Sequence, residues 1–237
     1  MTENVASDGK LLIEAWSDVV CPWCWIGWTR LNKALDAFGH TGQITVVPRA
    51  YRLMPGMRPT PIAEIIAAKT RLPVSEVPAM LHQVETVAAT EGLAYDLAGT
   101  LAGDTIDAHR LIQFAQEQGR GHALLERLYR AYLSEHTSVF DHDSLLSIAV
   151  DAGLEREEAR KVLGSDAVMA RVEEDQLALQ ALGGSGVPFF RIGGRYLISG
   201  AQPQEVFAKA LQQAWDERPV VVVQGAVCGP DGCALPS

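Results

Sequence analysis

The hydrophobic and polar positions of this 237-residue chain predict strands at its beginning and again near its end. The apolar run LLIEAW at 11–16 predicts a buried strand. In CPWCWIGWTRLNKALDAFG, at 21–39, apolar side chains recur at helical spacing and the segment ends in glycine, a common helix stop. The run QITVVPRAYRL at 43–53 predicts a second strand, and its Pro48 favours an edge position or the end of the strand.

The middle and the end of the chain follow two further patterns. Between 55 and 183 the apolar positions keep helical spacing, and Gly or Pro separates most of the segments. In VPFFRIGGRYLISG, at 187–200, a Gly-Gly pair lies between two apolar runs, which predicts a β-hairpin. The segment 201–217 then predicts an amphipathic helix.

This order of elements predicts an α/β fold. A β-α-β half and a β-β-α half are separated by a large all-helical domain inserted between them. We therefore expect one domain formed by residues 1–54 and 184–218, an inserted helical domain at 55–183, and a C-terminal tail at 219–237.

Composition narrows the class of protein. The apolar fraction of 48% and the charged fraction of 21% are those of an ordinary globular protein. No apolar run approaches the roughly 18 residues of a membrane span, and the polar N-terminus lacks the pattern of a secretory signal. The net charge is −9 with scattered basic residues, which disfavours nucleic acid as a partner. We expect a cytoplasmic protein with neither nucleic-acid nor membrane partners.

The four cysteines occur as two close pairs, Cys21/Cys24 and Cys228/Cys233. Structural disulfides are rare in a reducing compartment, so close pairs there more often indicate catalysis or metal binding. A zinc site formed by all four cysteines is one alternative, and a purely structural disulfide is another. The position of the first pair at the opening of an amphipathic helix favours redox chemistry over both.

A C-x-x-C pair at a helix start has a direct redox mechanism. The positive end of the helix dipole stabilises a thiolate at Cys21, which makes Cys21 the attacking group. Cys24 lies one turn later, where it can attack the resulting mixed disulfide and resolve it. Pro22 and Trp23 lie between the two cysteines and are expected to tune the reduction potential of the pair. Of the nearby tryptophans, Trp23 is expected to be exposed and to contact substrate.

Three further positions are candidates for the site. Pro188 precedes an apolar strand, where a cis peptide bond is plausible. Glu14, in the first strand, would relay the proton of the resolving cysteine if it is buried beside it, although strand alternation could instead point it outward. His109, near the start of a helix in the insertion, would polarise a thiol or line a peptide groove, or it is simply a packed histidine.

Four motifs together carry a resemblance to a known family: SDVVCPWCWIG, DAHRL, GVPFF and ISGAQP. They resemble the cytoplasmic branch of the DsbA family, specifically the FrnE-like dithiol oxidoreductases, and the resemblance extends from Leu11 to about Trp215. It implies a thioredoxin-like fold, with Cys21 as nucleophile and Cys24 as resolving cysteine. It also implies a cis Pro188 beside the pair, preceded by Val187, whose backbone would bind the substrate. CGPDGC matches a C-x4-C pair found in some members.

The resemblance leaves two functions open. The first, and favoured, function is that of a protein dithiol–disulfide oxidoreductase without a cofactor, acting on protein or small-thiol disulfides with an external reductant or oxidant. Cys228/Cys233 would be its auxiliary redox pair. The second is a glutathione-dependent isomerase or transferase of a small aromatic or polyketide compound, resembling 2-hydroxychromene-2-carboxylate isomerases. That branch typically has serine at the position of Cys21 and lacks the second cysteine, so the intact pair favours the first function.

Overall fold

A computed structural model describes residues 9–218, 227–229 and 232–234 of the chain. Its centre is a four-stranded sheet in the order β2-β1-β5-β6. β1 is parallel to β2 and antiparallel to β5, which is antiparallel to β6. The strands are β1 (Leu11–Ser17), β2 (Ile44–Ala50), β5 (Phe189–Ile192) and β6 (Tyr196–Ser199). The predicted hairpin is therefore confirmed.

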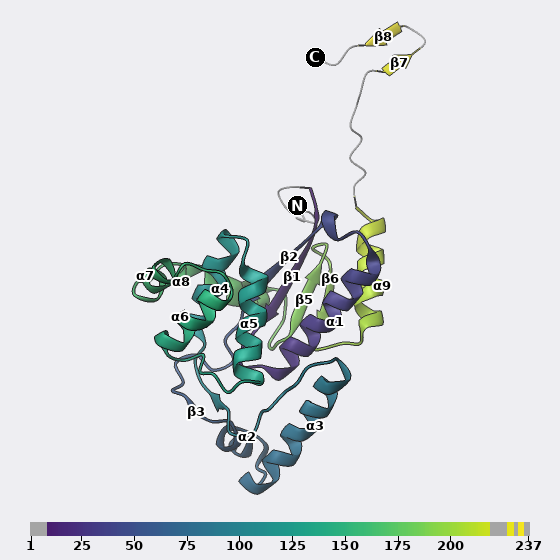
Figure 1. The fold of residues 1–237 in the computed structure, drawn as a ribbon. Coiled ribbons are helices and arrows are strands. Elements are labelled where there is room, and N and C mark those ends of the chain that lie inside the picture. Colours follow the sequence, from purple (N-terminus) through teal and green to yellow (C-terminus); the bar gives the residue numbers. More distant parts are fainter. Residues whose placement is uncertain (1–8, 219–226, 230–231, 235–237) are drawn as a thin grey trace.

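Two helices, α1 (Pro22–Phe38) and α9 (Gln204–Asp216), pack together against one face of this sheet (Figure 1). Alternate β1 side chains such as Ile13 and Ala15 lie in the core on that face. α1 ends where Gly39 adopts a left-handed conformation, with φ 77°, and donates its N–H to the carbonyl of Leu35. The predicted extent of this helix is thus confirmed.

The segment between β2 and β5 is helical, as the sequence predicts. Its short strands β3 and β4 pair with each other, and a 3-10 turn occurs at Val74–Glu76; a second 3-10 turn, Thr41–Gln43, lies before β2. The elements are β3 (Thr60–Pro61), α2 (Ile62–Thr70), α3 (Val77–Thr90), β4 (Leu101–Ala102), α4 (Ile106–Glu117), α5 (Gly121–Leu133), α6 (His142–Asp151), α7 (Arg156–Leu163) and α8 (Met169–Ala181). The protein is a thioredoxin-like α/β fold with a helical insertion.

α8, the last helix of the insertion, packs against the sheet as well as against another helix of the insertion, α4. α8 contacts β2, and its Leu179 packs with Trp16 and Phe189 in a second apolar cluster. The indole N–H of Trp16 donates to the carbonyl of Asp175 on α8 at 2.7 Å. α8 therefore covers the face of the sheet opposite α1 and α9.

The insertion and the sheet share one hydrophobic core. Cys24 and Trp28 of α1 lie in the same buried cluster as Leu111 of α4 and Tyr129 of α5. A side chain from each of α4 and α5 also covers the free edge of β2. Gln116 donates to the carbonyl of Pro48 at 3.0 Å, and the ring Nε2 of His122 lies 2.8 Å from the carbonyl of Val46. The predicted edge position of Pro48 is confirmed.

The C-terminal tail is described only in two short strands, β7 (Val227–Gly229) and β8 (Gly232–Ala234). They pair antiparallel, with Cys228 opposite Cys233. The remainder of the predicted tail, including the valine run at 220–223, lies outside the described residues. None of the described helices is both long enough and apolar enough to cross a membrane.

Candidate active site

Cys21 occupies the residue position immediately before α1. Its backbone is extended, and its N–H donates to the carbonyl of Asp18 at 3.1 Å. Pro22 is the first helical residue, where its missing N–H removes no helix hydrogen bond. The N–H of Cys24 donates to the carbonyl of Cys21 at 3.0 Å, which closes the first turn. The Cys21 sulfur thus lies at the positive end of the α1 dipole, a setting that stabilises a thiolate.

The two cysteines differ in exposure, and both are free thiols. Cys24 is 1% exposed and Cys21 is 6% exposed, whereas Trp23 between them is 41% exposed. Trp16, Trp25 and Trp28 are buried, so the prediction that Trp23 is the exposed tryptophan is confirmed. Cys21 lies at the boundary of the core and Cys24 is fully enclosed.

A proline loop faces the first cysteine. The Val187–Pro188 peptide bond is cis, as expected. The thiol of Cys21 lies 3.8 Å from the carbonyl oxygen of Val187. The Pro188 carbonyl accepts the N–H of Gly200 at 2.8 Å, which attaches the loop to the end of β6. This arrangement brings together Cys21, Val187 and Pro188, three of the residues that the sequence singled out.

α1 lacks a side chain where it passes the proline loop. A Cβ atom at Gly27 would lie 3.1 Å from Cγ of Pro188 and 3.2 Å from Cζ of Phe190. Both distances are shorter than ordinary carbon–carbon contacts. Glycine at this position therefore lets α1 and the loop approach closely enough to form the site.

Burial determines the protonation of the second cysteine. It raises the pKa of the Cys24 thiol well above its usual value, and the neighbouring Cys21 thiol and the negative charge of Asp18 raise it further. A hydrogen bond from the Asp18 backbone acts in the opposite direction. Cys24 therefore holds its proton at neutral pH, and it must lose that proton before it can act as a nucleophile.

Asp18 is a buried acid at this site that the sequence analysis did not select. It is 0% exposed and lies in the loop between β1 and α1. Its carboxylate accepts the N–H of Leu53 and the hydroxyl of Thr105, each at 2.8 Å. Its partners come from positions 35 and 87 residues further along the chain. Only its place within SDVVCPWC could have drawn attention to it.

His109 lies at the site, in the first turns of α4, as the sequence predicted. It is 1% exposed, and its Nε2 lies 3.5 Å from Oδ1 of Asp18. The geometry of this contact is not that of a hydrogen bond, and Nε2 has no hydrogen-bond partner. A buried polar atom without a partner is uncommon and calls for an explanation.

Glu14 does not fit the proton-relay role expected for it. Its carboxylate pairs with Arg49 of β2 at 2.8 Å and with Arg191 of β5. Strand alternation places Glu14 on the same face as Trp16, which packs against α8. α1 and Cys24 pack on the other face. The two arginines explain why this acid is buried without facing the thiols.

The ion pair between Glu14 and Arg49 is part of a larger network that includes Asp175 of α8. Arg49 also pairs with Asp175 at 3.0 Å, and the other oxygen of Asp175 accepts the N–H of Ala50 at 2.8 Å and the side-chain amide of Gln113. Burial is the largest influence on the pKa of Asp175 and raises it, while the Ala50 N–H and Arg49 partly offset that effect. This buried network fastens α8 to the sheet.

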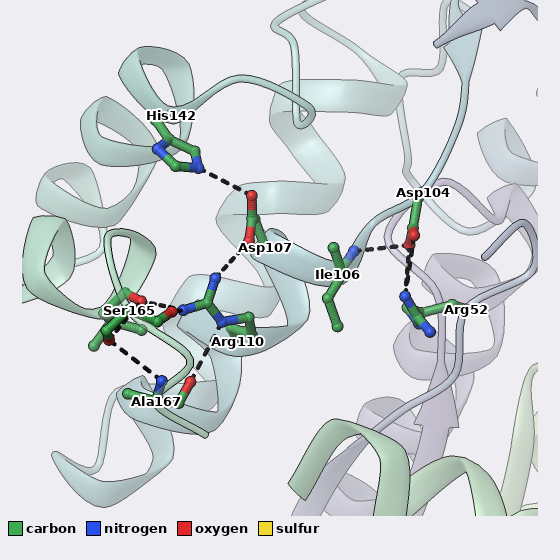
Figure 2. A network of polar contacts seen from close by, with 9 residues as sticks. Arg52, Asp104, Ile106, Asp107, Arg110, His142, Ser165 and Ala167 are labelled. Carbon is green, nitrogen blue, oxygen red and sulfur yellow. Dashed lines mark hydrogen bonds and ion pairs between the residues drawn. The ribbon is translucent and has the colours of Figure 1, made fainter. Parts of the chain in front are cut away.

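The start of α4, which carries His109, is anchored on two sides (Figure 2). Asp104 accepts the N–H of Ile106 at 3.1 Å and pairs with Arg52 at 3.0 Å. One turn on, Arg110 pairs with Asp107 at 2.7 Å and donates to carbonyl groups at the end of α7 and in the loop after it. These contacts hold the start of α4 against the segment that follows β2 and against the loop after α7.

Aromatic side chains from the insertion enclose the first turn of α1. The Tyr95 hydroxyl donates to the Pro22 carbonyl at 2.7 Å. The ring of Trp25 stacks on Tyr95 and on Tyr129, with centroid distances of 5.5 Å and 6.0 Å. Burial raises the pKa values of both tyrosines, and that of Tyr132 to about 12. These hydroxyls therefore stay protonated at neutral pH, and those of Tyr95 and Tyr132 donate to the carbonyls of Pro22 and Leu101.

The second cysteine pair lies on the short strands β7 and β8. The backbone register places Cys228 opposite Cys233, and their side chains lie outside what the structure describes. Within the described part of the chain, no three His, Cys, Asp or Glu side chains gather in an arrangement suited to a metal ion.

The site has the features of one class of protein. A thiol pair at a helix N-terminus beside a cis-proline loop, on a sheet of this topology, defines a thioredoxin-fold thiol protein. The family model described as the DSBA-like thioredoxin domain matches residues 12–212, and the chain belongs to this family.

A solved structure with high similarity is a probable DsbA oxidoreductase from Streptomyces coelicolor. It is 42% identical, with a TM-score of 0.84 over 96% of this chain and 100% of that chain. The cytosolic disulfide reductase DsbM from Pseudomonas aeruginosa is 17% identical, with a TM-score of 0.59 over 86% and 98% of the two chains. A 2-hydroxychromene-2-carboxylate isomerase is 14% identical, with a TM-score of 0.63 over 87% and 97%. The last two likenesses show the fold alone.

Proposed function

We propose that the protein is a dithiol–disulfide oxidoreductase in which Cys21 is the nucleophile and Cys24 the resolving cysteine. The observation that carries the proposal is the placement of the two thiols. The sulfur of Cys21 lies at the N-terminus of α1, 3.8 Å from the carbonyl before Pro188. Cys24 lies one turn further and is almost fully buried. This difference in position and burial suits one thiol that reacts with substrate and a second that resolves the mixed disulfide.

The proposed reaction is two successive thiol–disulfide exchanges. The Cys21 thiolate attacks a substrate disulfide, one substrate sulfur leaves as a thiolate, and a mixed disulfide forms on Cys21. Cys24 then loses its proton and attacks the Cys21 sulfur, so the second substrate sulfur leaves with the electron pair. The enzyme is left with a Cys21–Cys24 disulfide, which an external dithiol reduces. The same steps in reverse oxidise a substrate dithiol, and the reduction potential sets the direction.

The surroundings of Cys21 favour an extended substrate. Val187 offers backbone groups beside the reacting sulfur of Cys21, and Trp23, two residues further along the chain, is exposed. An extended segment that carries a cysteine could pair with the Val187 backbone and pack against the Trp23 ring. We infer that protein or small-thiol disulfides are the substrates and that the reaction takes place in the cytoplasm.

Reduction of insulin disulfides by dithiothreitol tests the proposed activity. The wild-type protein should accelerate the turbidity that follows release of the insulin B chain. Cys21→Ser should lose this acceleration, because the attacking sulfur is gone. The double variant Cys228→Ser/Cys233→Ser should retain it, because dithiothreitol in this assay reduces the Cys21–Cys24 disulfide directly and an auxiliary pair is not needed. Unchanged activity in Cys21→Ser would refute the assignment of the nucleophile.

Cys228 and Cys233 are proposed to form the auxiliary redox pair. Directly opposed residues of an antiparallel pair have Cα atoms roughly 4.5–5.5 Å apart, within the range that a disulfide spans. A pair closed over so short a loop adds little stability, which favours a reversible role. Thiol counting on the oxidised Cys21→Ser/Cys24→Ser variant tests this. No free thiols are expected after mild oxidation, and two free thiols would contradict the pairing.

A glutathione-dependent isomerase or transferase has no specific support in the site. The likeness to the isomerase concerns the fold, and the present chain has both cysteines. The two functions differ in their need for the second thiol. Activity that survives Cys24→Ser and depends on saturable glutathione binding would favour the isomerase or transferase.

A further inference from the structure

A cavity of about 270 Å³ lies within the insertion, between the segment that leads into β4 and the loop that follows α5. Its volume exceeds the roughly 150 Å³ in which a cavity holds one benzene molecule, and it approaches the roughly 300 Å³ at which small-molecule sites begin. Cys21, Trp23, Val187 and Pro188 are not among the residues that line it. The cavity is therefore distinct from the thiol site, and the function proposed above does not use it.

Two aromatic rings meet at the wall of this cavity. The rings of Tyr132 and Phe140 have centroids 6.2 Å apart and are nearly perpendicular, at 89°. The Tyr132 hydroxyl donates to the carbonyl of Leu101 at 2.6 Å, and a Cβ atom at Gly103 would lie 3.3 Å from Cε1 of Phe140. Each ring is thus held in place by its neighbours. A flat ring that enters the cavity can stack on one of them and meet the edge of the other.

The loop after α5 forms another wall and is tightly constrained. The N–H of Thr137 donates to the carbonyl of Ala131 at 2.8 Å, which folds the loop back on the helix. His136 has φ 53°, a left-handed conformation that glycine adopts at lower cost. Its Nε2 lies 3.1 Å from a carboxylate oxygen of Asp96. The loop therefore holds a strained residue at the cavity, and residues of this kind cluster at ligand sites.

The polar side chains of the cavity wall favour a neutral ligand. Apart from Tyr132, they are those of Thr100, His136, Thr137 and Ser138. No arginine, lysine, aspartate or glutamate lines the cavity, so a charged ligand would lose hydration without gaining a counter-charge from the wall. Within the part of the chain that the structure describes, the hydroxyl of Thr137 has no hydrogen-bond partner. A single polar group on the ligand can bond to it.

We propose that this cavity binds a neutral aromatic compound of one or two fused rings that carries one polar group. The ring packs against Tyr132 and Phe140, and the polar group forms a hydrogen bond with the hydroxyl of Thr137. Leu101, which lines the cavity and is 40% exposed, covers the part of the ring that faces solvent. This inference does not depend on the chemistry of Cys21, and the two proposals stand or fall separately.

Fluorine NMR with 5-fluoroindole as the probe tests this site in the full-length protein. The fluorine signal should shift or broaden as protein is added, with a dissociation constant in the millimolar range or lower, as expected for about ten non-hydrogen atoms. Indole should displace the probe, whereas cyclohexanol, which has a ring without a π face, should not displace it at the same concentration. Absence of saturable binding would overturn the proposal, and equal displacement by cyclohexanol would overturn the aromatic assignment.

Two substitutions locate the bound probe. Thr137→Val removes the hydroxyl and should weaken binding about 5-fold, the loss expected for one neutral hydrogen bond. Leu101→Trp enlarges a side chain of the cavity wall and should abolish saturable binding. Leu177→Trp, at an exposed leucine of α8, is the matched control and should bind the probe as the wild type does. Unchanged binding in Thr137→Val and Leu101→Trp would show that the probe binds elsewhere, and if one variant does not fold, the other decides.

Discussion

At the scale of single residues, the site depends on an unequal pair of thiols. Both cysteines belong to one short motif and to one buried cluster, yet Cys21 lies at the end of a helix dipole and is 6% exposed, whereas Cys24 is 1% exposed. The difference is produced by neighbours distant in sequence, such as Tyr95, Tyr129 and the loop of Pro188. The motif supplies two thiols one helical turn apart, and the surrounding fold gives them different exposure to solvent.

The raised pKa of Cys24 predicts how the stability of the reduced protein depends on pH. Above the ordinary thiol pKa of about 8.5, the unfolded chain releases a proton that the folded protein retains. The contribution is therefore fully present below that pH and is lost as pH rises, at up to about 1.4 kcal/mol per pH unit. Urea unfolding of the reduced protein between about pH 8.5 and 10 measures this slope.

The matched comparison is Cys24→Ala over the same interval. This variant lacks the thiol, so its stability should fall less steeply with pH. The tyrosines of the site titrate in the unfolded chain near pH 10 and contribute to the slope of both proteins, so the difference between the two slopes reports on Cys24. Equal slopes for the two proteins would show that burial of Cys24 does not control its ionisation.

At the scale of secondary-structure elements, the close approach of α1 to the proline loop is the critical contact. Gly27→Val should destabilise the protein by about 1–3 kcal/mol, because the new side chain would overlap Pro188 and Phe190. It should also slow insulin reduction by displacing the loop beside Cys21. Gly42→Val is the control, since a Cβ there meets no atom within 4 Å. Wild-type stability and activity in Gly27→Val would contradict this account of the contact.

The docking of α8 on the sheet depends on Asp175. Asp175→Ala removes an acceptor from Arg49, Gln113 and the Ala50 N–H. We expect a loss of about 3 kcal/mol, at the low end for a buried pair because Arg49 keeps its contact with Glu14. Glu117→Ala breaks an exposed pair with Arg171 and should cost less than about 1 kcal/mol. Urea midpoints give both values, and equal losses would show that the network is unimportant.

Sequence patterns correctly predicted those elements whose conformation is set by residues close to one another in the chain. Helix α1, the β5–β6 hairpin and the edge position of Pro48 follow from residue spacing, glycine and proline chemistry, all of which act over a few residues. The position of Glu14 could not be predicted in this way, because the arginines that hold it lie 35 and 177 residues away. Asp18 was missed for the same reason.

At the scale of the whole molecule, the predicted division into domains does not correspond to a division of the core. The insertion contributes α8 to one face of the sheet and aromatic side chains to the active site. Sequence patterns separate a helical segment from its flanks, but they carry no information about which apolar faces pack together. The shared core indicates that the two parts stabilise each other.

We therefore predict a single cooperative unfolding transition. All five tryptophans, at positions 16, 23, 25, 28 and 215, lie outside the insertion, whereas α2 to α8 lie within it. Tryptophan fluorescence thus reports on the thioredoxin-like half and on its contacts with the insertion, and far-UV circular dichroism reports largely on the insertion. Their urea midpoints should coincide. Two separated transitions would show that the insertion is an independent domain.

The central claim is that Cys21 attacks the substrate and Cys24 resolves the product. The most direct measurement is mass spectrometry of the covalent adduct that forms when Cys24→Ser reacts with a disulfide substrate such as oxidised insulin. The account predicts that one substrate chain accumulates on Cys21 as a mixed disulfide, whereas Cys21→Ser forms no adduct at Cys24. An adduct on Cys24 in the Cys21→Ser variant, or no adduct on Cys21 in Cys24→Ser, would contradict it.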